Sequence, residues 1–214
     1  MLISKSHKFL YYHLYKVAGT SIRNVLIPYC SKKQVIAQNI NHACSIFGIK
    51  LKIPPIYNFH PDLTDVKNYL GEEFNDYYRF TFVRNPLDWQ KSIYFFTKKN
   101  TRHHQHSIVK KMSFEEYIYW RINEDMKLAS DLLFHDGDCL VNDIYRYEDI
   151  TSEFKRLCKK INISAELPHK NIAGHNKKIT ISNKAIEDFI EAFKKDYEVF
   201  GYDPSSYTPF IDTK

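Results

Sequence analysis

The sequence predicts an α/β fold in which helices flank a central, mainly parallel β-sheet, and three observations lead to this expectation. Short β-rich apolar segments alternate along the chain with segments of helical spacing, which is the pattern of a parallel sheet. A length of 214 residues suits a single domain. A composition of 43% hydrophobic and 26% charged residues is typical of a globular protein, and it excludes a largely disordered chain.

The first half of the chain supplies two strands, each followed by a helix. Residues 9–14 form an apolar and aromatic run that indicates a buried strand. A turn of small residues at 16–21 follows it, and residues 22–26 have helical spacing. Residues 78–83 alternate and are β-rich, which predicts the second strand. An asparagine and a proline then begin a helix expected over residues 86–96.

The second half repeats the alternation of strand and helix. A third strand is expected near residues 143–147, and apolar residues at i, i+3, i+4 and i+7 predict a helix over 154–161. The same spacing predicts a helix over 186–197, which Gly201 would end. A further helix is expected near residues 114–122.

Charge and cysteine content narrow the class of partner. The chain has 31 basic and 25 acidic residues, a net charge of +6, which predicts an anionic partner. The basic residues are spread along the chain, so we expect no nucleic-acid partner. No two cysteines have C-x-x-C spacing, so we expect no zinc site. The cysteines, which we expect to be reduced, are Cys30, Cys44, Cys139 and Cys158.

Hydropathy predicts a cytoplasmic protein without a membrane span. No apolar run approaches the roughly 18 residues that cross a bilayer. Residues 1–13 contain lysines and histidines where a signal peptide needs an unbroken apolar stretch.

The turn at residues 16–21 has the features of an anion site. Backbone N–H groups at a helix N-terminus, together with the helix dipole, bind anions. Gly19 allows close approach of the backbone, Thr20 and Ser21 add hydroxyl groups, and Lys16 adds a cation. The turn is not the nucleotide-triphosphate loop, because no lysine follows a second glycine. The alternative is an ordinary corner capped by Thr20 or Ser21.

A second candidate anion site lies at residues 84–92. Arg84 ends the second strand, and its guanidinium group suits the oxygens of a phosphate. Ser92 follows eight residues later, about two helical turns along, and offers a hydroxyl group. The alternative is a surface arginine paired with Asp88, beside a serine without a special role.

These two motifs resemble those of sulfotransferases, in particular the carbohydrate type of sulfotransferase family 2. The string His13-x-x-Lys16-x-x-Gly19-Thr20-Ser21 resembles the family's 5′-phosphosulfate loop, and Phe82-Val83-Arg84-Asn85-Pro86 its 3′-phosphate motif. Three further segments resemble family patterns in the same order: residues 146–150, 167–171 and 196–202. Within them we expect Tyr147, Phe200 and Tyr202 in the core, and His169 and Asn171 as alternative nucleotide contacts. Trp89 departs from the family, which usually has an arginine at that position.

The resemblance implies a single P-loop-like sulfotransferase domain over residues 1–214. It implies transfer of a sulfuryl group from 3′-phosphoadenosine 5′-phosphosulfate (PAPS) to a hydroxyl group of a carbohydrate or glycoconjugate, with release of 3′-phosphoadenosine 5′-phosphate (PAP). It implies no metal. The 5′-phosphosulfate would be held by Lys16 with the backbone of Val17, Ala18, Gly19, Thr20 and Ser21. Lys16 would also neutralise the leaving oxygen, while Arg84 and Ser92 would bind the 3′-phosphate.

Sulfuryl transfer also needs a base for the attacking hydroxyl group. The family places a histidine about twenty residues before the Phe-Val-Arg motif, where this chain has His60, so we expect His60 to be the base. His13, Glu72 and Glu73 are the alternatives, and a surface or capping role for His60 remains open.

Two segments follow no family pattern, residues 30–57 and 98–137, and we expect them to be insertions that shape the acceptor site. The histidine-rich run at 102–106 is expected to be a solvated loop, with a lid over an anionic acceptor as the alternative. The resemblance to bacterial members without an anchor implies an acceptor in polysaccharide or lipid-linked glycan synthesis.

Two other function classes remain open. A P-loop nucleotide kinase would share the fold, although the missing Gly-Lys-Ser/Thr leaves no lysine for the β- and γ-phosphates. A non-catalytic module that binds anionic glycans would account for the net charge without any chemistry.

Overall fold

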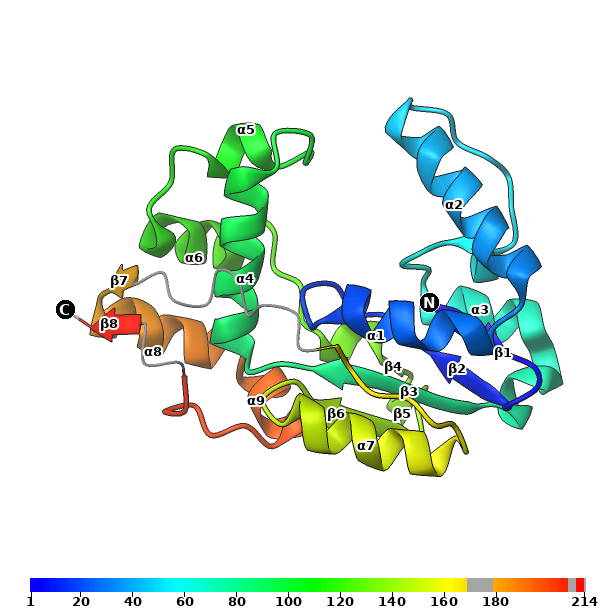
Figure 1. Ribbon diagram of the computed structural model, residues 1–214. Coiled ribbons are helices and arrows are strands. Elements are labelled where there is room, and N and C mark those ends of the chain that lie inside the picture. The colour runs from blue at the N-terminus through cyan, green and yellow to red at the C-terminus, as the bar shows by residue number, and fades with distance from the viewer. Residues whose placement is uncertain (169–178, 208–210, 214) are drawn as a thin grey trace. The chain divides into compact units, whose positions relative to one another are not determined.

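The computed structural model of the protein describes residues 1–168, 179–207 and 211–213. Its contacts divide the chain into two compact units, each made from two separate stretches (Figure 1). Unit 1 is Met1–Val83 with Leu132–His169, and unit 2 is Arg84–Asp131 with Lys170–Lys214. The expectation that the two form one domain stays a prediction.

Unit 1 is built on a four-stranded sheet. Its strands, in spatial order, are β1 (Leu2–Ser4), β2 (Phe9–Tyr11), β3 (Tyr78–Val83) and β6 (Asp143–Arg146). β2, β3 and β6 are parallel, and β1 pairs antiparallel with β2. The prediction of an α/β fold with a mainly parallel sheet is therefore confirmed, while the likeness to P-loop proteins stays a prediction. The three parallel strands end at the same edge of the sheet, where the loop after β2 begins.

Aromatic side chains fill the core of this sheet. Tyr11 stacks on Phe80, and Phe82 stacks on Tyr145, with ring centroids 5.4 Å and 5.2 Å apart. All four rings are buried. Adjacent parallel strands hold these rings in register, Tyr11 opposite Phe80 and Phe82 opposite Tyr145.

Unit 1 has two helices that the sequence predicted, α1 (Gly19–Leu26) and α7 (Ile150–Lys160), and two that it did not, α2 (Lys32–Ile46) and α3 (Leu63–Leu70). Short 3₁₀ turns η1 (Ile27–Tyr29), η2 (Pro55–Tyr57) and η3 (Gly71–Asp76) and the hairpin strands β4 (Phe134–His135) and β5 (Asp138–Cys139) complete the unit. The face of α7 that the spacing predicted, including Cys158, is buried. No pattern in the sequence had indicated α2 or α3.

Unit 2 is mainly helical. Its elements are α4 (Pro86–Lys99), α5 (His106–Val109), α6 (Phe114–Asn123), β7 (Ile179–Ile181), α8 (Asn183–Ala192), α9 (Lys194–Phe200) and β8 (Ile211–Thr213), and η4 (Ser130–Leu132) ends the stretch before unit 1 resumes. The expected helix over 186–197 is two helices, because the chain turns at Phe193. Gly201 ends α9 with φ of 62°, as predicted. Phe200 and Tyr202 are buried, whereas Tyr147 of unit 1 is only half-buried.

Of the helices in the described parts of the chain, none is both long and apolar enough to cross a bilayer.

Asp196 of α9 connects two parts of unit 2. Its side chain is 1% exposed and accepts hydrogen bonds from the backbone N–H groups of Ala129 and Ser130, both at 2.8 Å. Burial raises the pKa of this carboxyl group, and the bonds from Ser130 and Ala129 act in the opposite direction. The aspartate of the 196–202 segment therefore holds the turn at Ala129 against α9.

Replacement of Asp196 with alanine should lower the free energy of unfolding by about 2–4 kcal/mol, because two buried N–H groups lose their acceptor. Chemical denaturation measures the change. Asp131→Ala is the matched control, because it removes only an exposed ion pair with Lys195 and should cost less than about 1 kcal/mol. Equal losses in the two variants would contradict the role assigned to Asp196.

Candidate active site

The loop that follows β2 is anchored at its start by hydrogen bonds to β3. The N–H of Tyr12 donates to the carbonyl oxygen of Phe80 at 2.9 Å, and the hydroxyl of Thr81 donates to the carbonyl oxygen of Tyr12 at 2.8 Å. Thr81 is fully buried. The sheet therefore fixes the point from which residues 13–18 leave the strand.

The loop itself has an unusual backbone. Lys16 and Ala18 both have positive φ, 64° and 58°, a conformation that costs a non-glycine residue roughly 1–2 kcal/mol. Ala18 is the residue before α1, and its carbonyl oxygen accepts bonds from the N–H groups of Ser21 and Ile22. Strain of this kind is concentrated at functional sites. Backbone N–H groups in such a turn, followed by a helix N-terminus, form a concave site for an anion.

The imidazole of His13 leaves no space for a side chain at position 19, where the chain has glycine. A Cβ atom on Gly19 would lie 1.5 Å from Nε2 of His13, far inside van der Waals contact. The imidazole of His13 therefore packs directly on the backbone of Gly19. Val17 and Gly19 are buried, Lys16, Ala18 and Ser21 are half-buried, and Thr20 is exposed.

His13 is uncharged in this position. Its pKa is lowered to about 2, first by burial and then by neighbouring positive groups, among them the N-terminal amine and Arg23. The imidazole also stacks on Tyr11, with ring centroids 5.8 Å apart. We therefore assign His13 the role of a neutral packing group beneath the loop rather than that of a base.

His60 lies against the same loop. Its Nδ1 is 2.9 Å from the carbonyl oxygen of His13, and the two imidazole rings have centroids 4.7 Å apart. A carbonyl oxygen can only accept, so Nδ1 carries the proton and the lone pair of the neutral ring is on Nε2. The side chain is exposed at the surface of unit 1. The predicted base is thus beside the predicted phosphosulfate loop, with one nitrogen able to accept a proton.

The surroundings of His60 favour this neutral form. Loss of hydration around the ring lowers its pKa from the ordinary 6.5, the bond to His13 raises it, and nearby positive groups including Arg23 lower it further. The net shift is downward. A neutral histidine at neutral pH is the form that a general base requires.

The alternative carboxylate bases lie at the other end of β3. Glu72 and Glu73 belong to η3, which precedes the first residue of β3, and β3 is parallel to β2. The loop of residues 13–18 follows the last residue of β2, so Glu72 and Glu73 lie at the opposite end of the parallel strands from this loop. Glu73 instead accepts a hydrogen bond from the hydroxyl of Tyr77 at 2.6 Å.

Arg84 and Ser92 belong to unit 2. Arg84 is only 5% exposed and stands two residues before the start of α4, where Asn85 caps the helix by accepting from the N–H groups of Leu87 and Asp88. Ser92 is half-buried on α4. Trp89, where the family that the sequence resembles usually has an arginine, is 2% exposed and lies in the core.

Lys91 is a residue of this region that sequence reasoning missed. It is 3% exposed, and burial lowers the pKa of its amine, while Asp88 raises it and Arg84 lowers it. Arg84 and Lys91 are therefore close enough to repel each other in a buried part of unit 2. Lys91 follows Arg84 by seven residues, about two helical turns, and this spacing was the signal in the sequence that could have identified it.

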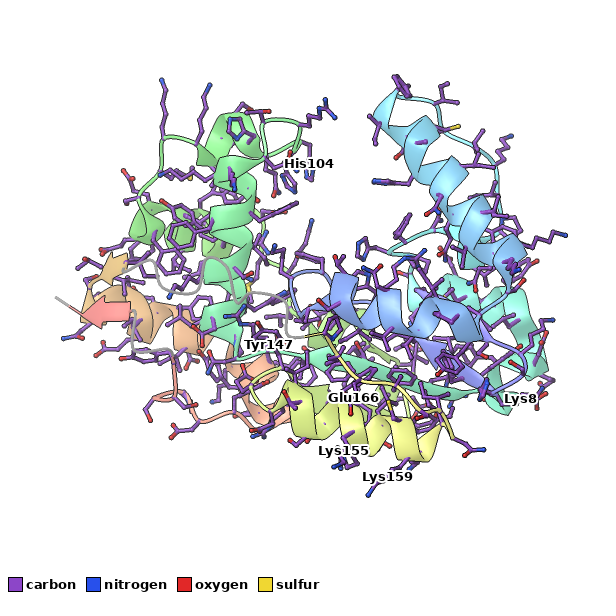
Figure 2. All side chains as sticks on the ribbon, in the orientation of Figure 1. Lys8, His104, Tyr147, Lys155, Lys159 and Glu166 are labelled. Atoms are coloured by element: carbon purple, nitrogen blue, oxygen red, sulfur yellow. The ribbon has the colours of Figure 1, made fainter. Side chains whose placement is uncertain are left out.

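The histidine-rich run at 102–106 folds back on α4. Nδ1 of His106 is 3.0 Å from the carbonyl oxygen of Thr97, and Gln105 donates to the carboxylate of Asp125 at 2.7 Å. His103 stacks on His104, and His104, which Figure 2 labels, is exposed. Among the described residues, no three His, Cys, Asp or Glu side chains are placed to hold a metal ion. His169 and Asn171 lie outside the described residues.

The chain matches the model of a protein family. A family model described as "Sulfotransferase family" matches residues 1–203. No curated protein and no solved structure matches the chain.

The packing of His13 on Gly19 predicts a change of sign in a double-mutant cycle. Gly19→Ala alone should lower the free energy of unfolding by about 1–3 kcal/mol, because the new methyl group displaces the imidazole. In a His13→Ala background the same change should be neutral or stabilising by up to about 1 kcal/mol, because alanine favours the helix. Chemical denaturation of the four proteins measures the coupling. Equal costs in both backgrounds would show that the two residues do not interact.

Proposed function

Because the chain belongs to the sulfotransferase family, we propose that it transfers a sulfuryl group from PAPS to a hydroxyl group of a carbohydrate or glycoconjugate. The observation that carries the proposal is the position of His60 against His13, whose imidazole in turn packs on Gly19 of the loop of residues 16–21. A proton acceptor and an anion-binding turn are the two groups that this reaction needs close together.

The loop suits the phosphosulfate end of the donor. Left-handed residues at Lys16 and Ala18 and the N-terminus of α1 supply backbone N–H groups, and Thr20 and Ser21 supply hydroxyl groups. Lys16 would stabilise the negative charge that develops on the leaving oxygen. PAPS supplies the sulfuryl group, and the 3′-phosphate that distinguishes it from ATP would be bound by Arg84 and Ser92, with Lys91 as a further cation.

His60 would act on the acceptor. As the acceptor oxygen forms its bond to sulfur, the bond from sulfur to the 5′-phosphate oxygen breaks, and the hydroxyl proton passes to Nε2 of His60. The hydrogen bond from Nδ1 to the carbonyl oxygen of His13 holds the ring in the tautomer that can accept this proton. The proposed products are a sulfate ester and PAP.

Calorimetric titration with PAP, 5′-AMP and magnesium-ATP tests the donor. We expect PAP to bind more tightly than 5′-AMP, and Arg84→Ala should weaken PAP binding by roughly 10- to 100-fold, the cost of a charge-assisted hydrogen bond, with little effect on 5′-AMP. Arg156→Ala, which removes an exposed arginine of α7, is the matched control. Preference for magnesium-ATP would favour a kinase, and no binding of any of the three would favour a glycan-binding module.

The base assignment predicts a specific dependence on pH. His60→Gln should abolish most turnover and leave PAP binding intact, because glutamine cannot take up the proton. In the wild type, the fall of kcat/KM on acidification should have its midpoint below 6.5, because the pKa of His60 is lowered and the ring stays neutral to lower pH. His104→Gln, at an exposed histidine, is the control. Unchanged turnover in His60→Gln would transfer the base role to another residue.

A further inference from the structure

Helix α2 has its polar side buried and its apolar side exposed. Gln34 and Gln38 are 5% and 0% exposed. Gln34 accepts from the N–H of Ile3 at 3.1 Å and donates to the carbonyl oxygen of Ile56 at 3.0 Å. Gln38 donates to the carbonyl oxygens of Met1 and Ile56, at 2.8 Å and 3.0 Å. This is the reverse of an ordinary surface helix, whose apolar stripe faces the core.

The opposite side of α2 carries an apolar stripe in contact with solvent. Ile36, Ile40 and Phe47 are 58%, 53% and 81% exposed. At 100° per residue, these positions fall within a narrow arc on the side away from Gln34 and Gln38. Figure 1 shows α2 rising from the sheet of unit 1.

The segment after α2 extends this apolar surface. Gly48 has φ of 75°, and the N–H of Ile49 donates to the carbonyl oxygen of Cys44 at 3.0 Å, which closes the helix in a Schellman-type turn. Ile46, Ile49 and Leu51 are also exposed. Among the described residues, eleven large apolar side chains are exposed, and six of them belong to this one segment.

Lysines flank the apolar residues of this segment in the sequence, and the segment contains no acidic residue. Lys32 and Lys33 stand at the start of α2, and Lys50 and Lys52 follow it; all four are exposed. The first acidic residue of the whole chain is Asp62. Residues 1–61 therefore carry eight Lys and Arg and no Asp or Glu: Lys5, Lys8, Lys16, Arg23, Lys32, Lys33, Lys50 and Lys52.

We propose that this segment is a docking surface for a membrane with anionic lipid headgroups. The docking surface consists of Ile36, Ile40, Ile46, Phe47, Ile49 and Leu51 with Lys32, Lys33, Lys50 and Lys52. An amphipathic helix that combines an apolar face with flanking lysines lies in the membrane interface, where the apolar side chains enter the acyl boundary and the lysines meet lipid phosphates. The inference does not depend on the proposed sulfuryl transfer.

A second copy of the chain fits this surface less well. In a two-fold symmetric dimer the same patch would face itself. Four lysines on each copy would then be brought together in a segment that offers no carboxylate to either. An anionic lipid surface neutralises these charges, whereas a second copy doubles them.

Co-sedimentation of the full chain with vesicles tests the proposal. Vesicles of phosphatidylcholine with phosphatidylglycerol, at about three to one, should bind the wild type, and pure phosphatidylcholine should bind it much less. Ile40→Ser/Phe47→Ser should weaken binding to the anionic vesicles by about tenfold or more, and so should Lys50→Glu/Lys52→Glu. All four side chains are exposed, so circular dichroism and thermal melting should show an intact fold.

Two matched controls separate this surface from general effects. Lys155→Glu/Lys159→Glu makes the same charge change on exposed positions of α7 in unit 1 (Figure 2). Val199→Ser removes an exposed apolar side chain of unit 2. Both should bind vesicles like the wild type. The proposal is overturned by vesicle binding that survives in the two docking-surface variants. It is also overturned if the wild type binds no vesicles but forms a dimer, by sedimentation equilibrium, that Ile40→Ser/Phe47→Ser dissociates.

Discussion

The contact between the imidazole of His13 and the backbone of Gly19 is the constraint on which the candidate site depends. It leaves no space for a Cβ atom on Gly19, and it supports the turn in which Lys16 and Ala18 take left-handed conformations. The same residue, His13, presents its carbonyl oxygen to Nδ1 of His60 and so selects the tautomer of the proposed base. One neutral histidine thereby connects the anion-binding turn to the group that would accept the proton. Because its pKa is about 2, this support keeps its charge state throughout the physiological range of pH.

The start of α4 contains more buried charge than a stable helix needs. Arg84, Asp88 and Lys91 are each at most 5% exposed, and burial of charged groups contributes little or nothing to stability. Gln90 is fully buried as well and accepts from the hydroxyl of Tyr117 at 2.9 Å. Arg84 and Lys91 supply two positive charges here, and Asp88 supplies one negative charge. This balance is consistent with the proposed binding of a 3′-phosphate.

The parallel sheet could be predicted from the sequence, because residues 78–83 and 143–147 carry strong strand patterns. The family could be predicted as well, because the turn and arginine motifs are specific. Sequence reasoning missed α2, since a helix that hydrogen-bonds through glutamines and exposes isoleucines presents no apolar face to a core. It joined α8 and α9, since the apolar spacing continues through the turn at Phe193. It ranked His13 among the possible bases, because burial and the loss of hydration that lowers its pKa are properties of three-dimensional packing. The choice of His60 as the base rested on the family pattern alone, because no local signal in the sequence relates His60 to His13, 47 positions away.

The attachment of α2 through glutamine side chains also determines how this helix can open. When α2 leaves the rest of unit 1, hydrogen bonds to backbone carbonyl groups are exchanged for hydrogen bonds to water, and little apolar surface is newly hydrated. The heat capacity and the denaturant slope of unfolding scale with newly exposed surface, so both should be small for this step. Opening of α2 is thus a local event with its own free energy, separate from the cooperative unfolding of the aromatic sheet. In amide hydrogen exchange, such a helix exchanges at a rate that is almost independent of denaturant, while the strands beneath it respond steeply.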